Sequence, residues 1–121
     1  TSNKSELLLG YGTIFGDLAC AINPIGDIYK SDLFELAKYL GVNDNILKKA
    51  PSADYYEGQS DEADLGYSYS KIDSLLKKMI DENRSKDELL ALGFEDEFIE
   101  TIKKRVKINE FKRRLPIVAK I

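Results

Sequence analysis

The chain has 121 residues, 43% of them hydrophobic and 32% charged, which is typical of a single folded domain and excludes a disordered tail. No apolar run reaches the roughly 18 residues that a membrane-spanning helix needs, and no leader-like segment opens the chain, so we expect a cytoplasmic protein with no membrane partner. One cysteine and no histidine exclude an internal disulfide, a Cys–His catalytic pair and a Cys–His zinc site, while the formal net charge of -3 says little about partners.

The first residue is Thr1 and not an initiator Met, so we expect the chain to belong to a larger protein. It opens with TSNKSELLLGYGTIFGD, in which Asn3 and Glu6 have the spacing of a capping box at a helix start. A carboxylate in the first helical turn is also able to hold Mg²⁺ against a nucleotide, because the amides there attract phosphate. These residues alone leave both roles of Glu6 open. Residues 19–22 give a weak strand signal, and Cys20 is expected to be buried.

The middle of the chain predicts two amphipathic helices. The first, SDLFELAKYLG, has Ser31 as its N-cap and Gly41 as its terminator, and the second, SKIDSLLKKMI, begins with a capping box from Ser70 to Asp73. Between them, residues 50–66 (APSADYYEGQSDEADLG) carry Pro, Gly, Ser and acids without an apolar period, which predicts a long loop. Loops of this length in compact domains are usually functional or disordered.

The last part of the chain predicts two more helices. Ser85 and Glu88 repeat the capping-box pattern, and Gly93 ends the short helix that follows. A longer helix comes next, with apolar residues at helical spacing: Phe98, Ile99, Ile102 and Val106. The C-terminal half is therefore predicted to be all helical.

Several segments, taken in their order and spacing, resemble the C-terminal half of the NAD synthetase family. They are TSNKSE, LGYGTIFGD, INPIGDIYKSDLFELAKYLG, PSAD, GQSDEADLGYSYSKID and NEFKRRLP, and they reach from residue 1 to residue 116. That family belongs to the ATP pyrophosphatase branch of the adenine-nucleotide α-hydrolase-like fold. The resemblance implies an α/β fold in which this chain, itself mostly helical, forms the C-terminal part of a Rossmann-like parallel sheet flanked by helices. Residues 1–121 would be the C-terminal portion of one amidation domain, and the N-terminal half with its phosphate-binding loop would lie outside this chain.

The resemblance also implies a reaction. In this family the nicotinate carboxylate of deamido-NAD attacks the α-phosphorus of ATP, which releases pyrophosphate and leaves an adenylated intermediate; ammonia then displaces AMP and gives NAD. Such chemistry needs Mg²⁺ and cationic side chains on the polyphosphate, and a site that excludes water. The implied enzyme is an ammonia-dependent ligase that forms a homodimer. The chain alone is expected to be inactive, because the phosphate-binding loop is not in it.

Matching positions imply roles for single residues. Those that would contact ATP are Thr1, Lys30 and Ser52. Glu6 would ligate Mg²⁺, and Asp17 would lie near the nicotinate ring and help to place the substrate or the ammonia. Lys30 stands at an expected helix start, where a cation is unfavourable by roughly 0.3–1 kcal/mol, so we expect a bound polyphosphate to compensate for it. Without the resemblance, Lys30 is a solvated lysine and Asp17 a turn aspartate.

The resemblance extends to the loop and the C-terminal basic residues. Residues 53–66 resemble the mobile loop that closes over the nucleotide, with Asp61 and Glu62 near the closed site, although a solvated acidic loop explains either acid equally well. Lys112 and Arg113 match a basic tail that reaches deamido-NAD, often from the partner subunit. A basic helix end also favours the helix dipole by itself.

Three positions depart from the family pattern. Ile14, Ala21 and Phe111 stand where many ammonia-dependent members carry Lys, Asp and His near deamido-NAD, which leaves the detailed substrate contacts open. NKSE and KRR also fit the glutamine-dependent branch, whereas SDEADLGYSY favours ammonia. Two alternatives stay open: another ATP pyrophosphatase, such as a GMP or tRNA-modifying synthetase, and a helical binding module with its basic residues 103–114 on nucleic acid. The overall acidity and the lack of interleaved aromatics argue against a nucleic-acid partner.

Overall fold

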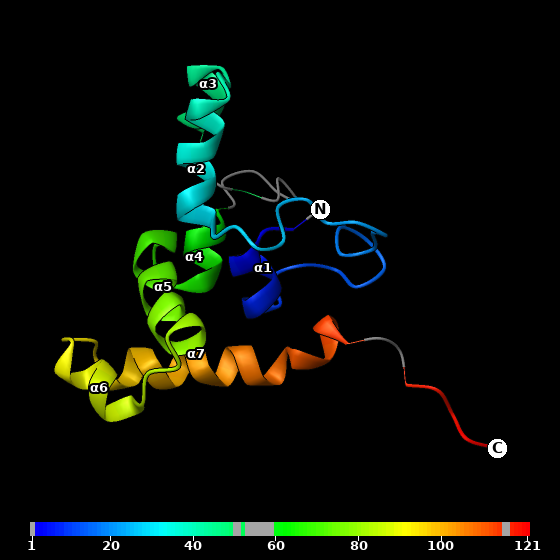
Figure 1. Cartoon of the computed structure of the whole chain (residues 1–121), viewed down its shortest axis with the longest axis vertical. Helices are drawn as coiled ribbons and strands as arrows, with labels where there is room; N and C mark the ends of the chain where they lie inside the picture. Colours follow the sequence, from blue (N-terminus) through cyan, green and yellow to red (C-terminus); the bar gives the residue numbers. More distant parts are fainter. Residues whose placement is uncertain (1, 50–51, 53–59, 115–116) are drawn as a thin grey trace.

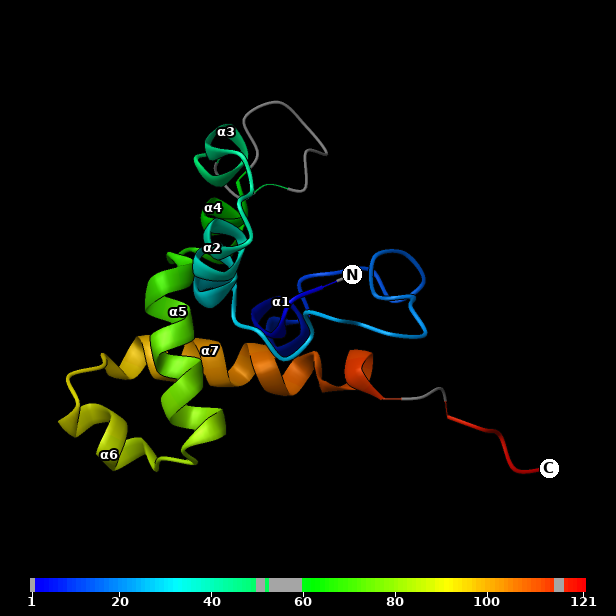
Figure 2. The same ribbon diagram turned by 45° about the horizontal axis from the view of Figure 1, so that its top comes forward.

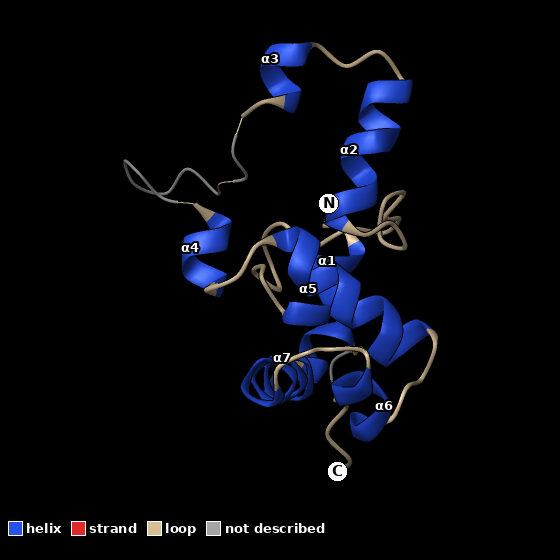
Figure 3. Cartoon of the chain, turned by 90° about the vertical axis from the view of Figure 1, so that its left-hand side faces the viewer, coloured by secondary structure: helices blue, strands red, loops and turns tan. Residues whose placement is uncertain are grey.

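The computed structural model describes residues 2–49, 52, 60–114 and 117–121, and every structural statement below refers to these residues. They form helices joined by turns, with no β-strand among them (Figure 3). The helices are α1 (Lys4–Leu9), α2 (Lys30–Tyr39), α3 (Asp44–Leu47), α4 (Asp61–Leu65), α5 (Tyr69–Leu76), the π-helical turn η1 (Lys77–Asp81), α6 (Lys86–Ala91), α7 (Asp96–Ile108) and the 3₁₀ turn η2 (Glu110–Arg113). The mostly helical prediction is confirmed. None of the described helices is both long enough and apolar enough to cross a membrane.

The short helix α1 lies at the centre of the arrangement, where it contacts α2, α5, α7 and η2. In Figure 1, α7 runs across the base, α5 rises from it toward α2, and α2 with α3 extends away as an arm; Figure 2 shows the same arrangement from a second side. The arm itself contributes no residue to the core, since no residue of α2 or α3 is buried. The buried apolar residues come mostly from α5 and α7: Leu9, Tyr29, Leu65, Tyr69, Ile72, Leu75, Leu76, Leu89, Phe98, Ile99 and Ile102.

Two predicted helix starts are wrong for one shared reason. α2 begins at Lys30, one residue before the expected cap Ser31, and its N-cap residue Tyr29 makes no side-chain capping hydrogen bond. α5 begins at Tyr69 after the cap Ser68, so the expected box from Ser70 to Asp73 does not form. Asp73 is 1% exposed and its carboxylate bonds to groups of α1 and α2. Its contact across helices therefore replaces the local cap that the sequence suggests.

Some of the other local predictions are wrong and others are confirmed. Helix α4 interrupts the long loop predicted for residues 50–66, because the Ser60 side chain accepts a hydrogen bond from the Ala63 amide and caps it. The strand expected at residues 19–22 is wrong, since the Ala19 and Cys20 amides bond to carbonyls only two or three residues back and form turns. Cys20 is exposed and not buried. The boxed helix at Ser85, which is α6, and the long final helix α7 are confirmed.

The capping box of α6 makes a prediction about acid stability. The backbone amide of Ser85 and, after it, the Arg84 guanidinium lower the pKa of Glu88 from 4.5 to about 2. A carboxyl whose pKa is lower in the folded state stabilises the fold above its unfolded pKa, and this contribution is lost as the pH falls. We therefore expect the melting temperature of the Glu88→Gln variant to fall less than that of the wild type between pH 4.5 and pH 2. Parallel slopes in thermal melts across that window would contradict the assignment.

Candidate active site

Glu6 and Lys30 form an ion pair where α1 and α2 begin. Lys30 Nζ lies 3.1 Å from Glu6 Oε1, and only 18% and 16% of the two side chains are exposed. The second oxygen, Glu6 Oε2, accepts a hydrogen bond from the Asn3 amide at 3.1 Å, and the Asn3 side chain accepts one from the Glu6 amide at 3.0 Å. The predicted capping box is therefore confirmed. The same carboxylate also faces Lys30, the lysine to which the family resemblance gives an ATP role.

The backbone amides at the start of α2 already have acceptors. The Lys30 amide donates to Ser5 Oγ at 2.9 Å, and the Ser31 amide donates to Asp73 Oδ2 at 2.8 Å. Together with Glu6, the Asp73 carboxylate supplies the negative charge that a helix start favours. These carboxylates offset the unfavourable position of the Lys30 cation at a helix start, so no polyphosphate is needed for that purpose, contrary to the sequence-based expectation. Any contact of this residue with ATP must come from its ammonium group and not from its backbone amide.

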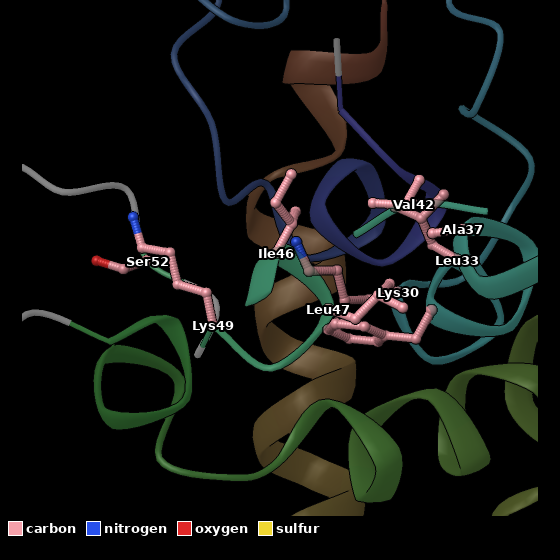
Figure 4. A pocket seen from close by; sticks show the side chains of 9 residues that line it. Lys30, Leu33, Ala37, Val42, Ile46, Leu47, Lys49 and Ser52 are labelled. Atoms are coloured by element: carbon pink, nitrogen blue, oxygen red, sulfur yellow. The ribbon is translucent and has the colours of Figure 1, made fainter. Parts of the chain in front are cut away.

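Lys30 and Ser52, two of the residues predicted to bind ATP, line one pocket of about 260 Å³. Figure 4 shows Lys49 and Ser52 at one side of this pocket and Lys30 beside Leu47 near its middle. The rest of the lining is apolar and is built by Leu33, Phe34, Ala37, Val42, Ile46 and Leu47. An apolar wall with a few polar groups is the usual form of a small-molecule site. The third predicted ATP contact, Thr1, lies outside the described residues.

Sequence reasoning missed α3 and with it Lys49. The Asn43 side chain accepts a hydrogen bond from the Asn45 amide at 2.8 Å and caps this helix, which carries Ile46 and Leu47 into the pocket wall. The available signal was an Asn followed by an acid, a second Asn and two apolar residues. Four residues are too few for the helical period to stand out.

The two acids predicted for the mobile loop lie on α4 and contact tyrosines. Asp61 is 5% exposed and accepts hydrogen bonds from the hydroxyls of Tyr11 at 3.2 Å and Tyr69 at 3.5 Å. Glu62 is exposed and accepts one from the Tyr69 amide at 2.9 Å. A solvated acid is therefore the wrong description of Asp61. Lys30 Nζ stands 5.6 Å from the centre of the Tyr69 ring, so this tyrosine connects α4 with the Glu6–Lys30 pair.

Burial of the Tyr69 ring, followed by the negative charges of Glu6 and Asp61, raises the pKa of its hydroxyl well above the ordinary value. Tyr69 therefore stays protonated and remains a donor to Asp61 at any pH near neutrality.

Asp17 lies in an exposed turn. Its Oδ1 accepts a hydrogen bond from the Thr13 amide at 2.7 Å, and its Oδ2 is 3.4 Å from the Ser2 hydroxyl. A Cβ at Gly12 would approach Asp17 Oδ2 to 2.6 Å, so a larger residue there would require the Asp17 side chain to shift. In the structure Asp17 therefore bonds within its own turn, as expected of a turn aspartate.

Lys112 and Arg113 bind the C-terminal end of α1. Lys112 Nζ donates to the carbonyls of Gly10 at 2.7 Å and Gly12 at 2.9 Å, and Arg113 Nη1 donates to those of Leu7 at 3.2 Å and Leu8 at 2.9 Å. α1 has no basic residue in its own last turn, so these cations satisfy its last carbonyls and its dipole. The expectation that these cations favour a helix dipole is confirmed, but the helix is α1 and not the one that carries them.

The Arg113 contacts predict a stability effect. Replacing Arg113 with Ala would leave two carbonyls of α1 without their charged donor, and we expect the free energy of unfolding to fall by about 1.5–3 kcal/mol. Arg114→Ala is the matched control, because Arg114 is exposed and pairs with Glu110 at the surface, where such pairs contribute about 0–1 kcal/mol. Chemical denaturation measures both. Equal losses in the two variants would show that the Arg113 bonds add nothing.

A family model described as NAD synthase matches residues 1–116. The chain is 54% identical to the NH(3)-dependent NAD(+) synthetase of Wolinella succinogenes and 55% identical to that of Campylobacter jejuni; both matches take in 100% of this chain, and 47% and 48% of the relatives. It therefore spans about half the length of the curated relatives it matches.

Solved structures of similar fold include the NMN synthetase from Francisella tularensis, with a TM-score of 0.80 and 36% identity over 100% of this chain and 45% of that chain. An NH3-dependent NAD synthetase from Campylobacter jejuni has a TM-score of 0.72 and 43% identity over 99% of this chain and 43% of that chain. The family match over nearly the full length, together with these identities, shows that the chain belongs to the NAD synthase family.

Proposed function

We propose that this chain supplies part of the ATP site of an enzyme that amidates deamido-NAD to NAD. ATP would be converted to AMP and pyrophosphate through an adenylated intermediate, with ammonia as the nitrogen donor. The observation that carries the proposal is the pocket in which Lys30 and Ser52 meet an apolar wall beside Glu6. The other half of the enzyme, which corresponds to the rest of the relatives' length, would supply the phosphate-binding loop, the parallel sheet and the remaining contacts with the nucleotide.

Lys30 would exchange its carboxylate partner for the polyphosphate. Its ammonium is a compact charge with rotatable donors on a flexible stem, so it is able to turn from Glu6 toward a phosphate while it stays near the Tyr69 ring. Ser52 would donate its hydroxyl to the same phosphates. The apolar wall would pack against the nucleoside, and this packing would keep water away from the reacting phosphate.

Glu6 fits a Mg²⁺ site as a single ligand. Among the described residues, no group of three or more acidic or cysteine side chains could hold a metal ion. Mg²⁺ at a nucleotide is usually held by one or two carboxylates together with phosphates and water, so one carboxylate from this chain is a sufficient contribution. Glu6 would become available when Lys30 turns to the phosphates. A bound Mg²⁺ would neutralise the charge that builds on the departing pyrophosphate.

Asp17 is the acid that we propose on the deamido-NAD side. Lys112 binds the carbonyls of Gly10 and Gly12, which come just before the turn that carries Asp17, so we propose that Lys112 acts by fixing this turn. Arg113 would fix the preceding helix α1 in the same way. Asp61 and Glu62 would hold the end of the loop that closes the site. We also propose that the full-length enzyme is a homodimer in the cytoplasm, which rests on the family resemblance alone.

A second acceptor is possible within the same chemistry. The Francisella tularensis protein with a TM-score of 0.80 is named an NMN synthetase, so the second candidate for the enzyme that contains this chain is amidation of the mononucleotide acid to NMN. Ile14, Ala21 and Phe111 depart from the pattern expected near deamido-NAD, which favours a test of both acceptors. The relatives named above are NAD and NMN synthetases, and none of them is a GMP or tRNA-modifying enzyme.

The test is product formation by the full-length enzyme that contains this chain, supplied with ATP, Mg²⁺ and ammonia. We expect pyrophosphate and NAD in equal amounts with deamido-NAD, and a much lower kcat/KM with the mononucleotide acid. Preference for the mononucleotide would select the second candidate, and pyrophosphate release without either acceptor would overturn both. The 121-residue chain alone is the control and should form no NAD.

A further inference from the structure

The N-terminus of α2 is capped by side chains from other helices. The side chain of its N-cap residue, Tyr29, makes no capping hydrogen bond. Instead, Ser5 Oγ of α1 accepts a hydrogen bond from the Lys30 amide at 2.9 Å, and Asp73 Oδ2 of α5 accepts one from the Ser31 amide at 2.8 Å. The Ser5 hydroxyl in turn donates to Asp73 Oδ1 at 2.6 Å. A carboxylate and a hydroxyl thus perform together what one capping residue usually does.

This polar cluster is buried and fully paired. Ser5 is 0% exposed and Asp73 is 1% exposed, and each oxygen of the Asp73 carboxylate has a donor. A slip of α2 against α1 or α5 would leave a buried donor or acceptor without a partner, which costs far more than the same slip between apolar faces. The cluster therefore fixes one placement of the start of α2.

That placement determines where the Lys30 ammonium stands. Ser5 and Glu6 are neighbours in α1, so the Lys30 backbone is held by Ser5 while its side chain is held by Glu6 at 3.1 Å. Lys30 is also a lining residue of the pocket that contains Ser52. A displacement of about 1 Å in a charged group that contacts the substrate is enough to slow the reaction severely.

We infer that Ser5 and Asp73 are positioning residues for ATP: they fix the first turn of α2 so that the Lys30 ammonium, paired with Glu6 in the structure, is able to turn to the polyphosphate. The inference rests on the proposed function only in taking ATP as the ligand of this pocket. It assigns to buried Asp73 a role in nucleotide affinity that a purely structural core residue would not have.

The test compares Asp73→Asn and Ser5→Ala with a matched pair in the full-length enzyme. In Asp73→Asn one amide oxygen replaces two carboxylate oxygens, so either the Ser5 hydroxyl or the Ser31 amide loses its acceptor. Glu88→Gln and Ser85→Ala are the controls, since they alter the capping box of α6, a helix that contacts neither α1 nor α2 closely. The measurements are the Kd of MgATP by calorimetry, hydrogen exchange of the Lys30 and Ser31 amides, and melting temperature.

We expect Asp73→Asn to raise the Kd of MgATP on the order of tenfold and to speed exchange of the Ser31 amide, while the controls lower the melting temperature and leave the Kd unchanged. An unchanged Kd in Asp73→Asn, whatever its stability, would overturn the inference. If the enzyme binds ATP but does not amidate deamido-NAD, the proposed function fails, and the Kd comparison still decides the role of Asp73. An enzyme that binds no ATP overturns both.

Discussion

Glu6→Gln in the full-length enzyme is expected to lower the rate of adenylation roughly 100-fold or more, the size of effect seen when one preorganised charge-stabilising group is removed. Gln is able to keep the hydrogen bond from the Asn3 amide, so the capping box and the start of α1 should survive. It loses the negative charge that pairs with Lys30 at 3.1 Å and that would ligate Mg²⁺. With its single oxygen on the Asn3 amide, Gln offers Lys30 no acceptor in place of Glu6 Oε1, so we expect the free energy of unfolding to fall by about 1–2 kcal/mol.

The measurement pairs single-turnover pyrophosphate release, over a range of Mg²⁺ concentrations, with thermal melts. A variant that needs more Mg²⁺ for the same rate supports the ligand role. A variant that melts at a clearly lower temperature but adenylates normally would show that Glu6 serves only the capping box and the ion pair. Glu88→Gln is the control, because it makes the same chemical change in the other capping box, away from the pocket.

Lys30→Ala should weaken MgATP binding on the order of tenfold to a hundredfold, because a charge-assisted contact to phosphate is lost. Sequence reasoning alone predicts that stability without ligand is unchanged or slightly better. The structure predicts a loss of about 1–2 kcal/mol instead, since the Glu6 partner and the Tyr69 ring contact both disappear. Lys30→Arg should rescue only in part, because a planar fork replaces a compact charge.

The control for Lys30 is Lys38→Ala, in the last turn of the same helix and exposed. It should alter stability by a few tenths of a kcal/mol through the helix dipole and leave ATP binding unchanged. Equal ATP affinities for Lys30→Ala and the wild type would remove α2 from the nucleotide site.

Local pairs were predictable from the sequence, whereas contacts across the chain were not. Asn3 with Glu6 and Ser85 with Glu88 are three residues apart, so the capping boxes can be recognised from spacing alone. Asp73 has the same spacing from Ser70, yet its partners Ser5 and Ser31 lie 68 and 42 residues away. Only the tertiary fold decides between such competing acceptors.

The basic C-terminal residues illustrate the same limit. Lys112 and Arg113 were identifiable as cations near a helix end, but the carbonyls they bind lie 102 and 105 residues earlier, at Gly10 and Leu8. The substrate role that the resemblance gives to this pair therefore has to act through those contacts or displace them. The structure brings Lys30 and Ser52 to one pocket, and their ATP role stays a prediction; part of the apolar wall, Ile46 and Leu47, comes from the unpredicted helix α3.

Affinity labelling of lysines would show whether ATP binds in the pocket between α2 and α3. The full-length enzyme would be treated with an adenosine analogue that carries a lysine-reactive group in place of the terminal phosphates, and the modified residue identified by mass spectrometry. We predict labelling of Lys30 or Lys49, the lysines of this pocket, and protection of the same residue by MgATP. The second, larger pocket of about 480 Å³ provides the internal control, because it is lined by Lys71. MgATP-sensitive labelling of Lys71, or no labelling of any lysine in residues 30–49, would exclude ATP from the pocket between α2 and α3.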